Sequence, residues 1–264
     1  MSTTWRRALV TGASSGIGRA IALEAAARGA DVVLVARRAS MLQDVADTVR
    51  QAHGRAAEIL VADLTAQDGL DAVEARLRDE SSPIDLLVNN AGFGTFGTFH
   101  RLPVAREDEE IRLNVLALVR LSHAALSAMV PRGHGGVLNV SSSAGFQAMP
   151  YSATYCSTKA FVNTFTECLH EEAKGAGVHV SALCPGYVRT EFQDVANVST
   201  SVIPKFAWLD VHAVARQGLD AVSGNDALSV TGGLYRAGIA LNRLLPRAAV
   251  RRIAGAVASR RMKL

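Results

Sequence analysis

Cysteine is scarce in this sequence, and its three residues, at positions 156, 168 and 184, lack the close paired spacing of metal ligands. An odd number of cysteines also argues against a disulfide framework, so we expect free thiols, a cytoplasmic setting and no metal site. The first residues carry no apolar signal region of the secretory kind. Although 49% of the residues are hydrophobic, no run of about 18 apolar residues occurs, so no membrane-spanning helix is predicted.

Acidic residues are absent from positions 227–264, which hold eight of the 28 basic residues. The excess positive charge therefore belongs to the tail. Pro246 suits the first turn of a new helix, and apolar side chains follow at helical spacing: Val250, Ile253, Ala254 and Val257. A basic amphipathic helix can lie on an anionic membrane surface, on the protein's own surface or on a partner subunit. No nucleic-acid recognition motif accompanies the arginines, so no nucleic-acid partner is predicted.

Short apolar runs alternate with helical stretches along most of the chain. The runs predict parallel strands that are covered on both faces, at 7–11, 32–36, 57–62, 84–89, 136–141, 178–184 and 228–231. Between them, residues 19–28 and 40–53 predict helices, and Gly54 is a good stop for the second. The alternation predicts an α/β fold, a Rossmann-type doubly wound parallel sheet of about seven strands with helices on both faces.

The domain organisation follows from the same pattern. We expect one domain over residues 1–264, because no internal repeat or low-complexity linker divides the chain. Residues 187–222 break the alternation, with Pro204 and Trp208 in the middle, and predict a substrate lid region. Residues 233–264 predict a helical basic tail.

A glycine-rich turn lies between the first predicted strand and the first predicted helix. Gly12, Gly16 and Gly18 are spaced G-x-x-x-G-x-G, with Ser14, Ser15 and Ile17 between them. Missing side chains let the backbone turn tightly and approach a pyrophosphate at the helix N-terminus. The turn predicts a seat for a dinucleotide, and a purely structural turn is the alternative.

The end of the second strand bears on the choice of dinucleotide. NAD enzymes of this fold place an acidic residue here for the ribose 2′-hydroxyl, whereas this sequence has Ala36 followed by Arg37. Arg37 offers a guanidinium to a 2′-phosphate, and this favours NADP(H) as the cofactor, with NAD(H) as the alternative. Arg37 and Arg38 could also be ordinary surface charges without a role in cofactor binding. Asp63 and Leu64 follow the third strand, where Asp63 either contacts the adenine or caps a helix.

Tyr155 and Lys159 form a Y-x-x-x-K pattern and lie one turn apart on one face of a predicted helix. A phenol titrates near pH ~10, which makes it a poor acid or base at neutral pH. An ammonium beside it favours the phenolate and lowers that pKa. Together with the glycine turn, the pair predicts proton transfer beside a nicotinamide, and so carbonyl–alcohol redox chemistry.

Five elements in this order resemble the short-chain dehydrogenase/reductase family, in its single-domain branch of about 250 residues. They are the turn at 11–18, Asp63, the Asn-Asn-Ala-Gly sequence at 89–92, a serine thirteen residues before Tyr155 and Lys159, and the Pro-Gly-Tyr-Val-Arg-Thr sequence at 185–190. The resemblance runs from about residue 8 to 190, and more loosely to 231.

The resemblance implies roles for the catalytic residues. Ser142, chosen from Ser141 to Ser143 by its spacing, would hydrogen-bond the substrate oxygen. Tyr155 would be the general acid in reduction and the general base in oxidation. Lys159 would lower the pKa of Tyr155 and bind the nicotinamide ribose. Asn114 would hold a water in a proton relay, although a polar residue tolerated in a long helix is the alternative.

The resemblance also implies cofactor contacts and an assembly. Asn90, Ala91 and Gly92 would line the adenosine-ribose side of the cofactor. Pro185, Gly186, Val188 and Thr190 of the late Pro-Gly sequence would also contact the cofactor, and Thr190 would meet the nicotinamide carboxamide or a phosphate. A homodimer or homotetramer would form through the helices that carry Asn114 and Tyr155.

Aromatic side chains suggest the character of the substrate. Residues 93–99 contain three phenylalanines, and residues 146–150 contain Phe146 and Met149. If both segments border the nicotinamide, they indicate a small-molecule carbonyl or alcohol that is partly apolar; ordinary core packing is the alternative. The acidic run 107–110 predicts a solvated helix start, which the helix dipole favours.

Two functional hypotheses remain at this point. The first is an NADP(H)-dependent oxidoreductase that interconverts a carbonyl and an alcohol, in the cytoplasm or peripherally at a membrane. The second is a non-catalytic NADP-binding regulatory or scaffold protein with the same fold. The presence of the serine, tyrosine, lysine and asparagine together favours the enzyme.

Overall fold

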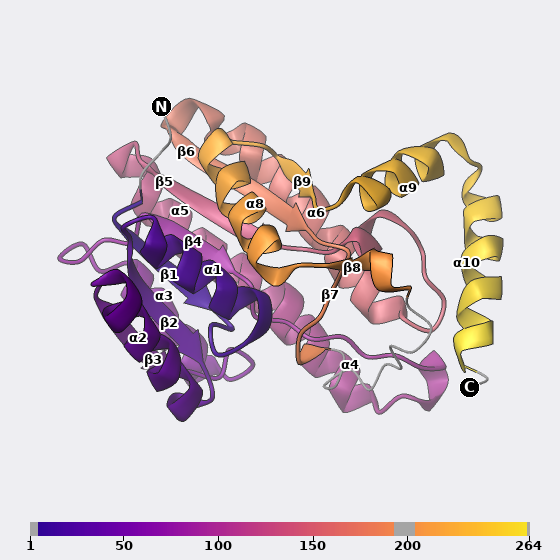
Figure 1. The fold of residues 1–264 in the computed structure, drawn as a ribbon, viewed down its shortest axis with the longest axis horizontal. Coiled ribbons are helices and arrows are strands. Elements are labelled where there is room, and N and C mark those ends of the chain that lie inside the picture. The colour runs from indigo at the N-terminus through magenta and orange to yellow at the C-terminus, as the bar shows by residue number, and fades with distance from the viewer. Residues whose placement is uncertain (1–4, 193–203, 263–264) are drawn as a thin grey trace.

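The computed structural model describes residues 5–192 and 204–262. Seven parallel strands form one sheet in the order β3-β2-β1-β4-β5-β6-β9, which confirms the doubly wound sheet (Figure 1). The strands are β1 (Arg7–Thr11), β2 (Asp31–Ala36), β3 (Ala57–Val61), β4 (Leu86–Asn89), β5 (Gly135–Val140), β6 (Val178–Cys184) and β9 (Leu228–Val230). The order reverses between β1 and β4, so a crevice forms at their carboxyl ends.

Alternate residues of each central strand fill two separate cores. Val10 and Leu34 pack in the core on one face of the sheet, whereas Leu9 and Val33 pack in the core on the other. This alternation explains why the strands are nearly unbroken apolar runs. The prediction of two covered faces is wrong for β3, where Val61 is 52% exposed, because β3 is an edge strand.

Helices cover both faces of the sheet. One face is covered by α1 (Gly16–Ala27), α2 (Ala39–His53) and α8 (Val211–Gly224). The other is covered by α3 (Gln67–Leu77), α5 (Leu118–Arg132) and α6 (Ala153–Ala173). Gly54 ends α2 in the left-handed region, at φ 62°, as its sequence predicts. Short 3₁₀ turns lie at Phe99–Arg101, Ser143–Phe146 and Lys174–Ala176.

One long helical stretch includes a π-helical turn. The short helix α4 (Val104–Ile111) continues through this turn, Arg112–Ala117, into α5. By length and composition alone the whole stretch, Val104–Arg132, could cross a membrane. Its apolar residues Leu121 and Met129 are fully buried in a core of the sheet, so we interpret it as a core helix. Wide turns of this kind often mark functional sites, and this one carries Asn114.

The region predicted as a lid at 187–222 divides into two parts. Tyr187–Val188 (β7) pairs in parallel with Trp208–Leu209 (β8), which follows a 3₁₀ turn at Lys205–Ala207. Residues 193–203 lie outside the described residues. From Val211 onward the chain forms α8, whose Val214 and Val222 are buried against the sheet, so this part belongs to the layer that covers the sheet.

The C-terminal segment is helical, as predicted. It forms α9 (Gly233–Leu244) and α10 (Arg247–Met262), which extend from one end of the molecule (right side of Figure 1). Pro246 directly precedes α10.

Candidate active site

A cavity of about 880 Å³ opens at the carboxyl edge of the sheet. The loops that follow the first six strands line it, and α9 and α10 add side chains at one end. Of the predicted site residues, all except Gly18 and Asn114 line this cavity. Predicted site residues that are far apart in the sequence, from Gly12 to Thr190, therefore line the same cavity. Doubly wound folds bind their ligands at this edge of the sheet.

The glycine turn is held against the loop after β4. Gly12 and Gly16 have positive φ angles of 65° and 56°. Asn90 Nδ2 donates to the Thr11 carbonyl at 2.9 Å, and Thr11 Oγ1 accepts from the amide of Asn90 at 3.0 Å. A Cβ on Gly18 would lie 2.3 Å from Asn90 Nδ2, so Gly18 permits this packing from behind the cavity wall.

Two arginines stand at the end of β2, and they behave differently. The Arg38 guanidinium donates to Ser14 Oγ at 3.1 Å and Ser15 Oγ at 3.0 Å, and it pairs with Glu191 at 3.0 Å. Arg37 is 69% exposed and lies 3.8 Å from Asp63. Arg38 was not among the residues predicted to bind the cofactor. The two adjacent arginines were visible in the sequence, but spacing alone does not show which of them faces the glycine turn.

Asp63 is held by its own loop. Its Oδ1 accepts from the Thr65 amide at 3.0 Å and from Thr65 Oγ1 at 2.7 Å. Burial acts to raise the pKa of Asp63, but these hydrogen bonds and the charge of Arg37 lower it overall. The helix α3 begins only at Gln67, after Ala66, so Asp63 stabilises the turn rather than the helix end and remains on the cavity wall.

Tyr155 lies between two aromatic rings. The ring centroids of Phe96 and Phe192 are 5.8 Å and 5.5 Å from that of Tyr155. Burial raises the pKa of the Tyr155 phenol, a hydrogen bond with Ser142 opposes this rise, and the charge of Glu110 adds to it. Ser142 Oγ also accepts from the Ala144 amide at 3.1 Å. Ser142 and Tyr155 both line the cavity.

Lys159 is buried behind Tyr155. Its Nζ donates to the Val140 carbonyl at 2.9 Å and lies 5.8 Å from the centroid of the Tyr155 ring. Burial lowers the pKa of Lys159 to about 8. The sequence led us to expect that Lys159 lowers the pKa of Tyr155, yet in this structure the phenol pKa is raised. Desolvation outweighs an ammonium that is directed toward a backbone carbonyl.

Asn114 fixes the loop that carries Gly92 and Phe93. Its Nδ2 donates to the Phe93 carbonyl at 2.8 Å, and its Oδ1 accepts from the Phe93 amide at 3.2 Å. Its Nδ2 also donates to Thr158 Oγ1 at 3.2 Å. A Cβ on Gly92 would lie 2.8 Å from Asn114 Oδ1. Asn114 therefore positions the cavity wall through backbone hydrogen bonds.

The expectation of a solvated acidic run at 107–110 is wrong for two of its residues. Glu107 is 5% exposed and Glu110 is 0% exposed. Both lie on the side of α4 that packs on α6, whereas the dipole argument considered only an isolated helix. Burial foremost, and then the neighbouring charge of Glu107, raises the pKa of Glu110 to about 7, although hydrogen bonds from Thr95 oppose the rise.

Apolar side chains form part of the cavity wall, beside polar ones such as Arg106, Gln147 and Asn242. The apolar ones include Phe93, Phe96, Met149 and Phe192, together with side chains of the C-terminal helices, Leu234, Ile239, Val250 and Ile253. Phe99 and Phe146, which belong to the two segments predicted at this border, do not line it. The direct contribution of α10 to the wall was missed, because sequence spacing shows the apolar side of a helix but not what that side covers.

Tyr235 on α9 anchors the C-terminal helices beside the cavity. Its hydroxyl donates to the Ala207 carbonyl at 2.7 Å and accepts from the Tyr187 amide at 3.0 Å. A Cβ on Gly186 would lie 2.1 Å from the Tyr235 ring. The Pro-Gly sequence at 185–186 therefore has a packing role as well as its predicted cofactor contact.

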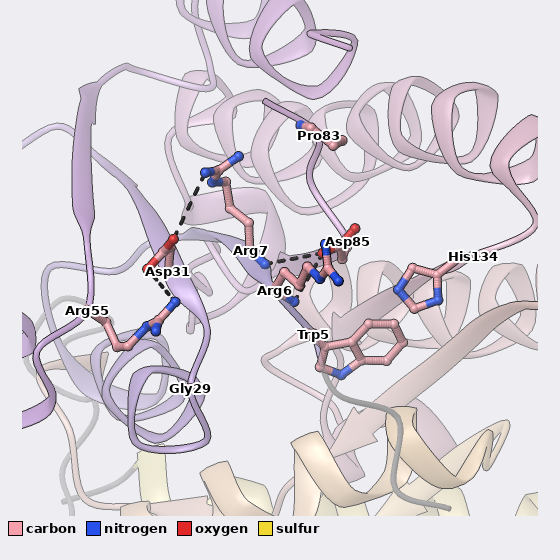
Figure 2. Close-up of a pocket in the computed structure, with 9 residues that line it drawn as sticks. All are labelled: Trp5, Arg6, Arg7, Gly29, Asp31, Arg55, Pro83, Asp85 and His134. Carbon is pink, nitrogen blue, oxygen red and sulfur yellow. Dashed lines mark hydrogen bonds and ion pairs between the residues drawn. The ribbon is translucent and has the colours of Figure 1, made fainter. Parts of the chain in front are cut away.

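A second cavity, of about 840 Å³, lies at the opposite, amino edge of the sheet (Figure 2). Its charged groups are largely paired with one another. Arg55 lies 2.8 Å from Asp31, and Asp85 accepts from the backbone amides of Arg6 and Arg7 at 3.0 Å and 3.3 Å. Within the described ranges, no group of three or more His, Cys, Asp or Glu residues could hold a metal ion. The candidate site is therefore the cavity at the carboxyl edge.

Comparisons with known proteins agree with this geometry. A family model described as short chain dehydrogenase matches residues 6–199. An uncharacterized oxidoreductase from Myxococcus xanthus is 38% identical over 228 residues, which are 86% of this chain and 87% of that protein. A short-chain dehydrogenase from Sphingobium yanoikuyae, solved in complex with NADPH, is 33% identical with a TM-score of 0.81, and the match covers 92% of this chain and 97% of that one.

A further relative is longer than this chain. The very-long-chain 3-oxoacyl-CoA reductase of Bos taurus is 34% identical over 192 residues, which are 71% of this chain. The match spans 61% of the bovine protein, less than two thirds of its length.

Proposed function

Because the chain belongs to the short-chain dehydrogenase/reductase family and is an oxidoreductase of that family, we propose that it interconverts a carbonyl and an alcohol with NADP(H). The observation that carries this proposal is the arrangement of the cavity. Ser142, Tyr155 and Lys159 line the same space as the glycine turn and the two arginines after β2.

The residues present suit NADP(H). Gly12 and Gly16 line the cavity at the N-terminus of α1, where a pyrophosphate would bind. Arg37 and Arg38 would hold the 2′-phosphate, with Ser14 and Ser15 beside them. Asp63 and Leu64 would contact the adenine. NADPH in the related Sphingobium enzyme supports this choice. When bound, the cofactor supplies or accepts the hydride at the carbonyl carbon.

Residues of the protein, rather than the cofactor, would transfer the proton. In reduction the Tyr155 hydroxyl would donate its proton to the carbonyl oxygen, and in oxidation the phenolate would take it back. Ser142 would donate a hydrogen bond to the same oxygen while negative charge develops there. The raised phenol pKa keeps Tyr155 protonated at neutral pH, which suits the acid role in reduction. Lys159 would bind the nicotinamide ribose.

We propose that the substrate is an apolar ketone or the corresponding alcohol. Aromatic and aliphatic side chains from the loops and from α9 and α10 form the substrate end. The bovine relative is named for very-long-chain acyl substrates, which also suits an apolar wall. Because Val250 and Ile253 line the cavity, packing of α10 on the protein's own surface is favoured over a membrane surface.

A homodimer or homotetramer remains part of the proposal. Ile111, Leu116 and Phe161 are large apolar residues that are 48%, 44% and 39% exposed. They lie on or beside α4, the π-helical turn and α6, where the predicted subunit contact would form. Association through these helices would bury this apolar surface.

Side-by-side fluorescence titrations with NADPH and NADH, followed by turnover with ketones of increasing apolar size, test the proposal. We expect NADPH to bind about tenfold more tightly, or ~1.4 kcal/mol, and larger apolar ketones to be reduced. Equal or tighter NADH binding would overturn the 2′-phosphate assignment. Tight binding without turnover of any ketone or alcohol would favour the regulatory or scaffold alternative, and binding of neither cofactor would contradict both.

A further inference from the structure

A carboxylate faces Arg38, one of the two arginines that would hold the 2′-phosphate, and the proposed function gives it no role. Nη2 of Arg38 lies 3.0 Å from Oε2 of Glu191. Both residues line the cavity at the carboxyl edge of the sheet. Glu191 follows β7 and is 153 residues from Arg38 in the sequence. The pair therefore joins two parts of the chain that meet only in the folded protein.

The same nitrogen of Arg38 faces more acceptors than it can serve. Ser14 Oγ at 3.1 Å, Ser15 Oγ at 3.0 Å and Glu191 Oε2 all lie within hydrogen-bond distance of Nη2, whereas a terminal guanidinium nitrogen has only two N–H donors. A phosphate oxygen that reaches Nη2 must therefore replace one of these three acceptors.

Glu191 is the acceptor that a phosphate would replace. The hydroxyl groups of Ser14 and Ser15 can turn and donate to a phosphate oxygen, so they can stay beside it. An ionised carboxylate only accepts hydrogen bonds, and it repels a phosphate of the same charge sign. The side chains of Arg38 and Glu191 are about half exposed, and exposed ion pairs of this kind are weak.

The neighbouring pair of Arg37 and Asp63 shows a different arrangement. Asp63 lies 3.8 Å from Arg37, but its carboxylate is held by the amide and the hydroxyl of Thr65. Within residues 5–192 and 204–262, the carboxylate of Glu191 bonds only Arg38. Glu191 can therefore leave its arginine without breaking the bonds of its own loop, whereas Asp63 cannot.

We propose that Glu191 is a specificity-determining residue, which holds Arg38 in the free protein and releases it when the 2′-phosphate of NADP(H) binds. This inference rests on the proposed function. Release of Arg38 lowers the affinity for NADP(H), because an ion pair is lost and a carboxylate stays near the phosphate. NAD(H) has no 2′-phosphate and leaves the pair intact. Glu191 therefore reduces the preference for NADP(H) that Arg37 and Arg38 create.

Glu191→Gln tests this role by removing the charge while keeping the length of the side chain and an acceptor oxygen for Arg38. Fluorescence titrations with NADPH and NADH measure the two affinities. We expect NADPH to bind about fivefold more tightly than to wild type and NADH affinity to change by less than about twofold, the range for loss of an exposed ion pair. An unchanged ratio of the two affinities would overturn the proposal.

Glu109→Gln is the matched control. It also removes a carboxylate that lines the cavity, but this carboxylate pairs with Arg106 rather than with Arg38. The variant should leave the ratio of NADPH affinity to NADH affinity as in wild type. A shift equal to that of Glu191→Gln would mean that only the net charge of the cavity matters, and the specific role of Glu191 would be refuted.

A double-mutant cycle tests whether the effect passes through Arg38. In an Arg38→Ala background no guanidinium remains to be released, so Glu191→Gln should raise the affinity for NADPH by less than about twofold. A full fivefold gain in that background would contradict the displacement of Glu191 from Arg38.

The outcomes separate this inference from the proposed function. Glu191→Gln should shift the ratio of affinities toward NADPH even if wild type binds NADH equally well or reduces no ketone. In those two cases the proposed cofactor preference or the proposed reaction fails, while the shift still supports the role of Glu191. Binding of neither dinucleotide by wild type and by Glu191→Gln would overturn both proposals.

Discussion

The cofactor side and the substrate side of the cavity are built in different ways. On the cofactor side, glycines and backbone groups of neighbouring loops bond one another, as Thr11 and Asn90 do. Around Tyr155, side chains from distant helices meet, as Glu107 of α4 and Thr154, the residue before Tyr155 on α6, do. The first arrangement needs particular residues at fixed spacing, whereas the second needs only that packed surfaces match. Substitutions on the two sides should therefore affect different properties of the protein, such as turnover, cofactor affinity and stability.

Tyr155→Phe should have the largest effect and should separate the two sides. The substitution keeps the ring between Phe96 and Phe192 but removes the proton donor, so kcat should fall about 10³-fold, within the range for general acid catalysis. The affinity for NADPH should not change. Steady-state NADPH oxidation and fluorescence titration measure the two quantities. Tyr151→Phe, an equal change at a residue that does not line the cavity, is the control, and comparable turnover by the two variants would refute the role of Tyr155.

Gly18→Ala should damage the cofactor side through packing. Its Cβ would lie 2.4 Å from the Gly12 carbonyl oxygen and 2.3 Å from Asn90 Nδ2, so the two loops must separate. We expect a loss of about 1–3 kcal/mol in the free energy of unfolding, together with weaker NADPH binding. Gly175→Ala is the control, since a Cβ there meets nothing within 4 Å. Equal thermal stability of the two variants would show that the tight packing at Gly18 is not required.

The same contrast explains how much could be predicted from the sequence. Gly12, Gly16, Tyr155 and Lys159 were found because their spacing on a turn or a helix determines which groups meet. The burial of Glu107 was missed because it depends on how α4 packs against a helix almost fifty residues away. Short motifs specify local geometry, whereas the contacts of α8 and α10 arise only when the sheet has assembled.

The free energy of unfolding should depend on pH through Glu110, a buried residue of α4. The folded-state pKa of Glu110, about 7, lies above its ordinary value of 4.5. Between these values the folded protein binds more protons than the unfolded chain, so the free energy of unfolding should fall as pH rises. The fall should be on the order of 3 kcal/mol, since each pKa unit corresponds to about 1.4 kcal/mol. Urea unfolding at pH 5 and pH 8 measures it. Glu110→Gln should remove this component, and an unchanged difference between the two pH values would contradict it.

Arg38→Ala should weaken NADPH binding by about tenfold and leave NADH binding nearly unchanged. Arg38 contacts both serines of the glycine turn, and a charge-assisted bond to a phosphate would be lost. Arg37→Ala should have a smaller effect because Arg37 is more exposed. Titrations with both dinucleotides measure this. A larger loss of NADPH affinity in Arg37→Ala would show that Arg37, the residue predicted from the sequence, is the main contact of the 2′-phosphate.

The smallest effect is expected where the tail meets the substrate side. Ile253 lines the cavity yet is 59% exposed, so an apolar substrate would cover a surface that otherwise faces water. Ile253→Ser should raise KM for a large apolar ketone about fivefold, equivalent to ~1 kcal/mol of lost burial, and leave KM for a small ketone unchanged. Leu244→Ser is the matched control, because Leu244 is 82% exposed and does not line the cavity. Equal effects of the two variants on the large ketone would mean that α10 does not contact the substrate, and its apolar side would then be free for a membrane or a partner subunit, the alternatives raised by its basic sequence.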